Sequence, residues 1–232
     1  MSEQAGVLFD FGGTLDADGL PWAARFYSAY RAAGGSASFA TFEPLFKVSD
    51  RALERLPAIR TLGFQAMAQA QARLLCELVP DGAALAPERV AERFHADSVA
   101  VVTRNRPLLE RLRRAYRLGI VSNFTGNLEL CLTELGLLEL FAAVADSALL
   151  GVAKPDRRIF TETLERLGLN PASTWMIGDN FEADIRPAAA LGMKTCWITP
   201  AERRAPGGVS PTARIQRLME LAEILPEAAC TA

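Results

Sequence analysis

The sequence predicts an α/β protein in which a parallel β-sheet core is interrupted by an inserted, all-helical segment. Two observations lead to this prediction. Short apolar runs typical of buried strands alternate along most of the chain with amphipathic stretches typical of helices. The residues between 16 and 105, in contrast, show helical patterns only. Because strands that alternate with helices imply right-handed crossovers, the strands are expected to form a parallel sheet covered on both faces.

The expected elements follow in order along the chain. The strands are predicted at residues 6–11 (GVLFDF), 118–123, 141–147, 174–179 and 194–199. Helices are predicted at 106–117, 127–140, 156–169 and 182–193, where Leu, Ile or Ala recur at three- and four-residue spacings. Residues 201–214 are expected to form a loop, and residues 213–225 (ARIQRLMELAEIL) a last surface helix.

The interruption of this alternation predicts two domains. Residues 1–15 and 106–232 are expected to form a Rossmann-like core, and residues 16–105 a helical cap domain. Open α/β sheets bind ligands in the crevice at the carboxyl ends of their strands, and the insertion begins at the end of the first strand. We therefore expect the insertion to cover a site and to contribute substrate contacts from Arg25, Arg51 or Lys47.

Composition and charge exclude several classes of protein. The chain has 232 residues, a formal net charge of −2 and no basic patch, so neither a nucleic acid nor a membrane is an expected partner, while a protein partner is not excluded. Its start, MSEQAG, is unlike a signal peptide, and no apolar run is long enough for a membrane helix. The four cysteines, Cys76, Cys131, Cys196 and Cys230, form no C-x-x-C pair, which argues against zinc and against a disulfide framework. A cytoplasmic location is the expectation.

Polar residues at the ends of the predicted strands indicate a functional site. They are Asp10, Ser122, Asn123 and Asp179, with Lys154 and Asp184 close to the following helices. In a parallel sheet these strand ends share one edge, so the side chains are expected to converge. Carboxylates gathered in this way repel one another unless a cation lies among them, and carboxylate oxygens are the ligands that Mg²⁺ prefers. The pattern predicts a Mg²⁺ site whose coordination is completed by a phosphate.

Four short motifs in this order resemble the haloacid dehalogenase superfamily of phosphohydrolases, in the subfamily with a helical cap after the first strand. The first motif, D-x-D-x-T, matches at Asp10 and Thr14, but Gly12 replaces its second Asp. The second motif matches at Ser122 and the third, K-P, at Lys154. The fourth, G-D-x-x-x-x-D, matches over residues 178–184.

The resemblance implies a role for each matched residue. Asp10 is the implied nucleophile, which forms an aspartyl-phosphate, with Ser122 and Lys154 holding the phosphoryl oxygens. The implied catalytic residues are Asp10, Ser122 and Lys154; the implied substrate-binding residues are Gly13, Thr14, Asn123 and Lys154; and the implied Mg²⁺ ligands are Asp10, Gly12 (through its carbonyl), Asp179 and Asp184. A purely structural interpretation also exists, because Ser122, Asn123, Asp179 and Asn180 all suit helix caps.

The absence of a carboxylate at position 12 affects the expected function. In the family's phosphatases that Asp is the general acid and base, which is worth about 10²- to 10⁴-fold in rate. We expect a slow Mg²⁺-dependent hydrolase of a small phosphorylated metabolite, in which Asp16 or Asp18 could substitute for the missing acid.

Two alternatives are also compatible with the sequence. One is carbon-centred chemistry like that of dehalogenases or phosphonoacetaldehyde hydrolases; the latter needs a cap lysine, and Lys47 is the only lysine of the cap. The other is a non-catalytic protein that binds a phosphorylated ligand or a protein partner. The sequence leaves the substrate and the oligomeric state open.

Overall fold

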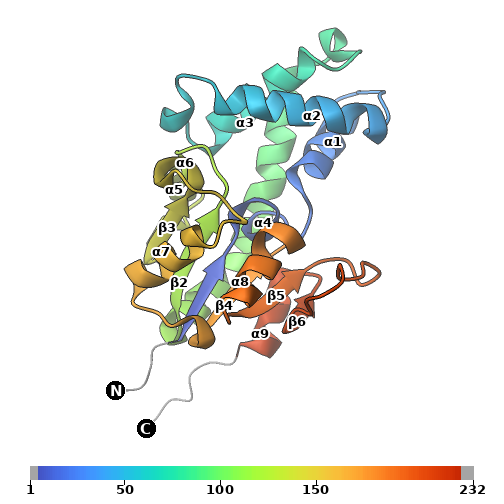
Figure 1. The fold of residues 1–232 in the computed structure, drawn as a ribbon. Helices are drawn as coiled ribbons and strands as arrows, with labels where there is room; N and C mark the ends of the chain where they lie inside the picture. Colours follow the sequence, from blue (N-terminus) through green and yellow to red (C-terminus); the bar gives the residue numbers. More distant parts are fainter. Residues whose placement is uncertain (1–4, 226–232) are drawn as a thin grey trace.

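The computed structural model describes residues 5–225 and contains a six-stranded, entirely parallel sheet (Figure 1). The strands lie in the order β3-β2-β1-β4-β5-β6. Their bounds are β1 Gly6–Phe9, β2 Arg117–Ser122, β3 Ala143–Asp146, β4 Thr174–Gly178, β5 Lys194–Ile198 and β6 Ala213–Ile215. The first five strands coincide with the predicted apolar runs, and the α/β prediction is confirmed.

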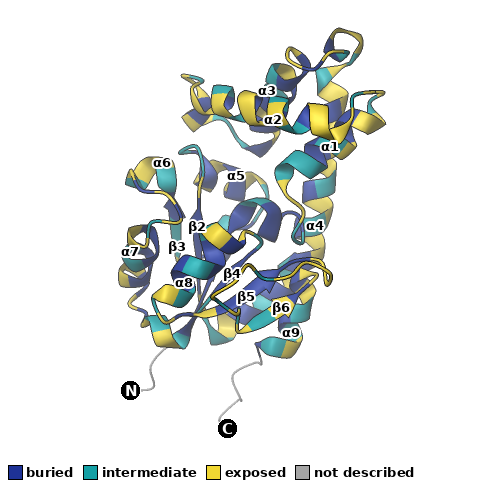
Figure 2. Cartoon of the chain, turned by 45° about the vertical axis from the view of Figure 1, so that its right-hand side comes forward, coloured by how far each residue is buried: buried dark blue, intermediate teal, exposed yellow. Residues whose placement is uncertain are grey.

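The helices form two groups. Those of the insertion are α1 (Trp22–Ala32), α2 (Phe39–Glu54), α3 (Phe64–Cys76) and α4 (Pro87–Ala115). Those around the sheet are α5 (Leu128–Glu134), α6 (Ser147–Leu150), α7 (Arg158–Leu167), α8 (Arg186–Ala190) and α9 (Leu221–Ile224). Figures 1 and 2 show α1, α2 and α3 beyond the carboxyl ends of the strands, with α4 running from them down along the sheet.

The sheet is covered on both faces, as the alternation of elements predicted. Val7 and Phe9 of β1 belong to one hydrophobic cluster, which also holds Leu109 of α4. Leu8, which points to the opposite face, belongs to a second cluster with Phe160 of α7. Successive residues of a strand face opposite sides, so β1 is apolar at every position because both its faces are buried.

Helix α4 crosses the predicted limit between insertion and core. It is continuous over 29 residues and passes residues 105 and 106 without a break, although Pro107 lies inside it. Its first half packs against α3 and α1, while Leu108, Leu109 and Leu112 are buried in the core. The insertion is thus connected to the core by a helix rather than by a loop on this side, and the division into domains at residues 16 and 105 stays a prediction.

The predicted surface helix at residues 213–225 is wrong. Residues Ala213–Ile215 instead form β6, which pairs with β5, and only Leu221–Ile224 form the short helix α9. Ile215, Leu218 and Leu221 are buried, at 4%, 0% and 0% exposure. Their three-residue spacing imitates a helix face, but the unpaired backbone edge of β5 favours a strand at this point. The predicted loop accordingly ends at residue 212.

Two further observations bear on the sequence predictions. Among residues 5–225, no helix is long and apolar enough to cross a membrane. Cys76, Cys131 and Cys196 are buried free thiols, and Cys230 lies outside the described residues.

Candidate active site

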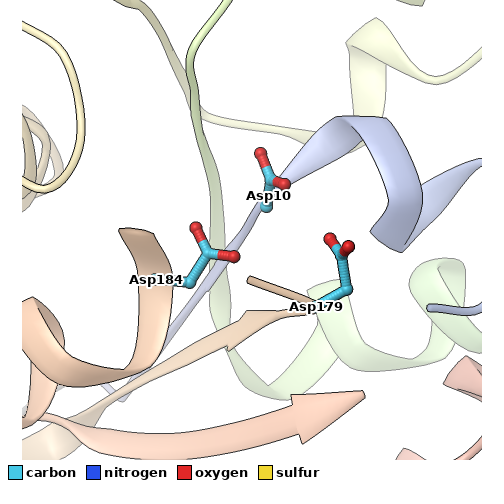
Figure 3. Close-up of side chains that lie close together, drawn as sticks. All are labelled: Asp10, Asp179 and Asp184. Carbon is cyan, nitrogen blue, oxygen red and sulfur yellow. The ribbon is translucent and has the colours of Figure 1, made fainter. Parts of the chain in front are cut away.

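The polar residues predicted from the strand ends lie together at one edge of the sheet. Asp10 directly follows β1, Ser122 ends β2 and Asp179 directly follows β4. They are neighbours because β1 pairs in parallel with both β2 and β4. Asp184 joins them from the turn before α8, and Figure 3 shows the carboxyl groups of the three aspartates clustered together.

The three carboxylates surround a small volume into which Lys154 projects. One oxygen from each of Asp10, Asp179 and Asp184 lies within 4.8 Å of the others. The Lys154 ammonium donates to Asp10 Oδ1 and to Asp184 Oδ1, both at 2.7 Å. The Ser122 hydroxyl donates to the same Asp10 oxygen at 2.9 Å. Asp10 is therefore held on one side by two donors, in a site where Lys154 is only 6% exposed.

The electrostatic environment is short of positive charge. Burial raises the pKa of Asp179 to about 8, and the negative charges of Asp10 and Asp184 add to this shift. Burial also raises the pKa of Asp184 to about 6, although the ammonium of Lys154 opposes the change. For Lys154, burial disfavours the charged form, yet the two adjacent carboxylates raise its pKa above the ordinary value. One ammonium thus faces three carboxylates, an arrangement that a divalent cation would stabilise.

Thr14 and Asn123 position other residues of the site. The Thr14 hydroxyl donates to Asp179 Oδ1 at 3.0 Å. The Asn123 side chain pairs with the backbone of Lys154, accepting from its N–H at 2.7 Å and donating to its carbonyl at 3.0 Å. Both contacts orient charged residues, and direct binding of substrate by Thr14 and Asn123 stays a prediction.

The turn after β4 is capped by Asn180 and not by Asp179. The Asn180 side chain accepts from the N–H groups of Glu182 and Ala183, both at 3.1 Å, and so caps the turn after β4. Because Asn180 already caps this turn, Asp179 is free to face the site. Ser122 donates to Asp10 rather than capping α5.

The two glycines after Asp10 differ in backbone conformation. Gly13 has a φ of +92°, and a Cβ added to it would lie 2.7 Å from Asp179 Oδ2, so this position requires glycine. Gly12 has a φ of −72° and a ψ of 118°, which any residue adopts. A Cβ at Gly12 would instead lie 3.2 Å from Nε1 of Trp22. The indole of Trp22 therefore lies against the position from which the missing side chain would start.

Asp16 and Asp18, which the sequence offered as possible substitutes for the missing carboxylate, are bound outside the cavity. Asp16 is fully buried and accepts from Trp22 Nε1 at 2.8 Å and from the Arg25 guanidinium at 2.5 Å. Asp18 accepts from the Asn105 side chain at 3.1 Å. Neither lines the cavity that contains Asp10. Both carboxylates connect the segment after β1 to helices of the insertion.

A cavity of about 450 Å³ extends from Asp10 to the insertion. The insertion lines it with two carboxylates and with apolar or aromatic side chains: Trp22, Phe46, Asp50, Leu53, Glu54 and Met67. The basic residues expected there, Arg25, Lys47 and Arg51, do not line the cavity. Arg25 is paired with Asp16, and Lys47 is paired with Glu43 at the surface. Arg51 is exposed. Asp50 and Glu54 were not predicted from the sequence, although the helical spacing of residues 46, 50, 53 and 54 places them on one face.

The sequence matches a family model and several known proteins. A family model described as haloacid dehalogenase-like hydrolase matches residues 5–192. Among relatives, pyrimidine 5'-nucleotidase YjjG of Escherichia coli is 36% identical over 121 residues, which cover 51% of this chain and 53% of that protein. Phosphoserine phosphatase of Thermus thermophilus is 34% identical over 121 residues, covering 51% and 49%. The matched region thus spans about half the length of these relatives.

Solved structures resemble the chain over nearly its whole length. Putative HAD-hydrolase YfnB of Bacillus subtilis, whose crystal structure was determined bound to magnesium, has a TM-score of 0.61 at 23% identity and covers 97% of this chain and 99% of its own. A HAD phosphatase of Thermococcus onnurineus has a TM-score of 0.58 at 26% identity, with 96% and 98% covered. The first of these likenesses bears on the fold alone.

Proposed function

Because the chain belongs to the haloacid dehalogenase-like hydrolases, we propose that it is a Mg²⁺-dependent phosphohydrolase of a small phosphorylated metabolite, with Asp10 as the nucleophile. One observation carries the proposal: Asp10, Lys154, Ser122 and the acidic pair Asp179 and Asp184 line one cavity. The relatives named as a nucleotidase and a phosphoserine phosphatase act on phosphomonoesters by their names, which supports the same class of substrate here.

The donor set fits Mg²⁺. Asp10, Asp179 and Asp184 offer hard carboxylate oxygens within 4.8 Å of one another. Burial, together with repulsion from the neighbouring carboxylates, raises the pKa values of Asp179 and Asp184, and a divalent cation would stabilise their charged forms. These three residues, with the Gly12 carbonyl, would hold the ion. When bound, Mg²⁺ would neutralise charge on the phosphoryl group.

Asp10 would carry the phosphoryl group between two displacements. In the first, a carboxylate oxygen of Asp10 would attack phosphorus, the bond from phosphorus to the ester oxygen would break, and the departing oxygen would take up a proton from solvent water. In the second, water would attack phosphorus and lose a proton to the solvent, and the bond from phosphorus to Asp10 would break, which releases inorganic phosphate and the Asp10 carboxylate. The Lys154 ammonium and the Ser122 hydroxyl, both already directed at Asp10, would donate to the phosphoryl oxygens in each step.

Proton transfer is the weak part of this site. Position 12 has no carboxylate, and Asp16 and Asp18 are bound elsewhere. We therefore expect turnover to be slow for esters whose leaving oxygen needs a proton, by about 10²- to 10⁴-fold relative to a site with a general acid.

The alternative chemistries have less support. A Schiff base from the cap would need Lys47, whose side chain is 64% exposed, paired with Glu43 and absent from the cavity lining. A metal-free dehalogenase would gain nothing from the acidic pair Asp179 and Asp184, and the structural likeness to dehalogenases at 18–19% identity bears on the fold alone. The cytoplasmic location stays a prediction, as does the absence of a nucleic-acid partner.

Hydrolysis of p-nitrophenyl phosphate tests the proposal. We expect phosphate release that requires Mg²⁺ and falls to background in Asp10→Asn, while Asp156→Asn, which alters an exposed carboxylate paired with Arg158, retains it. Equal rates with and without Mg²⁺, or an active Asp10→Asn variant, would reject the mechanism. A folded protein that binds phosphate but turns over no ester would identify it as a binding protein.

A further inference from the structure

The end of the cavity opposite Asp10 is formed by one face of α2. Phe46, Asp50, Leu53 and Glu54 follow one another at helical spacing and line the same cavity as Lys154. If the phosphoryl group of a substrate lies at Asp10, the rest of that substrate extends toward this face. The phosphoryl end of the cavity is formed by Asp10, Ser122 and Lys154, so Asp50 and Glu54 bear only on the part of the substrate that extends toward α2.

Asp50 and Glu54 have no counter-charge. Within residues 5–225, neither carboxylate makes a hydrogen bond or an ion pair, and the single ammonium among the lining residues, that of Lys154, is bound by Asp10 and Asp184. Burial raises the pKa of Asp50 to about 6, and the negative charge of Glu54 adds to the shift. Asp50 is half-buried and Glu54 is exposed, and the partly desolvated carboxylate of Asp50 gains free energy from a cation placed beside it.

Aromatic rings line the same cavity. Trp22 and Phe46 come from the insertion and Phe124 from the loop after β2. The indole of Trp22 is fixed by its hydrogen bond to Asp16 and by edge contacts with Phe64 and Phe124, at ring-centre distances of 6.1 and 6.0 Å. Aromatic faces attract ammonium groups through their ring quadrupole, so this lining suits a cation as well as an apolar group.

We propose that the substrate is a phosphomonoester whose leaving group carries an ammonium group, which Asp50 and Glu54 bind. This inference rests on the proposed function, since it places the phosphoryl group at Asp10. The same two carboxylates repel a leaving group that bears a second anion. The site would therefore discriminate among phosphorylated metabolites of equal size by the charge at the far end.

Three small esters provide the test, because they differ mainly in that charge: O-phosphoethanolamine carries an ammonium, glycerol 3-phosphate hydroxyls, and phosphoglycolate a carboxylate. We expect kcat/KM to be about tenfold or more higher for O-phosphoethanolamine than for glycerol 3-phosphate, and lowest for phosphoglycolate, in keeping with the strength of hydrogen bonds between charged groups. Equal values for the first two, or a preference for phosphoglycolate, would overturn the inference.

Variants assign the preference to the two carboxylates. In the double variant Asp50→Asn and Glu54→Gln, we expect the ratio of kcat/KM between O-phosphoethanolamine and glycerol 3-phosphate to fall to about 1. The control is Glu43→Gln, which removes an exposed carboxylate of the same helix that is paired with Lys47. An unchanged ratio in the double variant would contradict the assignment.

Binding separates this inference from the proposed function. Calorimetry of the Asp10→Asn variant, in which turnover is blocked, compares the affinities for O-phosphoethanolamine and glycerol 3-phosphate in the presence of Mg²⁺. Tighter binding of the amine supports the inference whether or not the parent is an enzyme, and equal binding overturns it. Activity on p-nitrophenyl phosphate, whose leaving group is uncharged at its far end, tests the proposed function alone.

Discussion

At position 12, the missing side chain and the indole of Trp22 occupy adjoining space. The ordinary backbone conformation of Gly12 admits an aspartate, but its Cβ would lie 3.2 Å from Trp22 Nε1 and 3.3 Å from Cε2, so the ring must shift by a few tenths of an ångström. Trp22 is anchored by Asp16, whose carboxylate also binds Arg25. A side chain at position 12 would therefore press against the indole of Trp22, which Asp16 holds in place.

Restoring the carboxylate is therefore a direct test of the missing-acid interpretation. Gly12→Asp is expected to raise kcat for glycerol 3-phosphate by up to about 10²-fold, because a carboxyl group two residues from Asp10 can protonate the leaving oxygen. Gly12→Asn has nearly the same size but lacks the carboxyl group, and it should bring no gain. Acceleration by both variants, or by neither when both are folded and bind Mg²⁺, would show that proton transfer at this position does not limit the rate.

The raised pKa of Asp50 predicts that the stability of the folded state depends on pH. Burial raises this pKa from 3.8 to about 6, so between these values the folded state holds more protons than the unfolded state, and stability falls as pH rises. At pH 7.5 the ionised, half-buried side chain lowers the stability of the folded state. Asp50→Asn should therefore be more stable than the parent at pH 7.5 and equally stable below about pH 4. Urea denaturation at several pH values measures this, with Glu43→Gln as the control; a gain independent of pH would contradict the assignment to Asp50.

At the scale of the elements, residues 213–225 were predicted as one surface helix but contain the edge strand β6 and the short helix α9. Ile215, Leu218 and Leu221 turn inward and join the hydrophobic cluster that contains Val7 and Phe9 of β1. The backbone continues the sheet, because the Thr199 N–H donates to the Ile215 carbonyl at 2.9 Å. The C-terminal segment of the described chain therefore contributes to the core.

Two adjacent residues test this placement. Leu218→Ala should lower the free energy of unfolding by about 2–5 kcal/mol, because it deletes a fully buried side chain from the core. Met219→Ala, at a side chain that is 39% exposed, should change it by no more than about 0.5 kcal/mol. Denaturant unfolding compares the two variants. A loss of unfolding free energy in Leu218→Ala as small as that in Met219→Ala would indicate that Leu218 lies on the surface.

For the molecule as a whole, binding of Mg²⁺ is expected to raise the stability of the folded state. A ligand that binds only the folded state stabilises it by mass action, by about 2.7 kcal/mol at a concentration 100 times the dissociation constant. The Tm should rise with Mg²⁺ concentration in the parent and in Asp97→Asn, which alters an exposed carboxylate of α4. Asp179→Asn should abolish the Mg²⁺-dependent rise, and a rise that persists in this variant would place the ion elsewhere.

The sequence alone predicted five of the six strands and the convergence of the charged residues at one edge of the sheet. Strand and helix periodicities are local properties, and their alternation leaves a parallel sheet as the consistent arrangement. Once the sheet is parallel, residues that follow β1, β2 and β4 must share an edge. Asp10, Ser122 and Asp179 therefore lie together although more than 100 residues separate the first from the others.

Only the tertiary structure shows which charged residues of α2 line the cavity. Helical spacing shows which residues of α2 share a face, but packing against α1 and α3 determines that Asp50 and Glu54 line the cavity while Lys47 is exposed to solvent. Asp16 likewise lies close to Asp10 in sequence, yet buried contacts with Trp22 and Arg25 turn it away from the cavity. The direction of a side chain depends on partners far away in the chain, and local patterns carry no information about them.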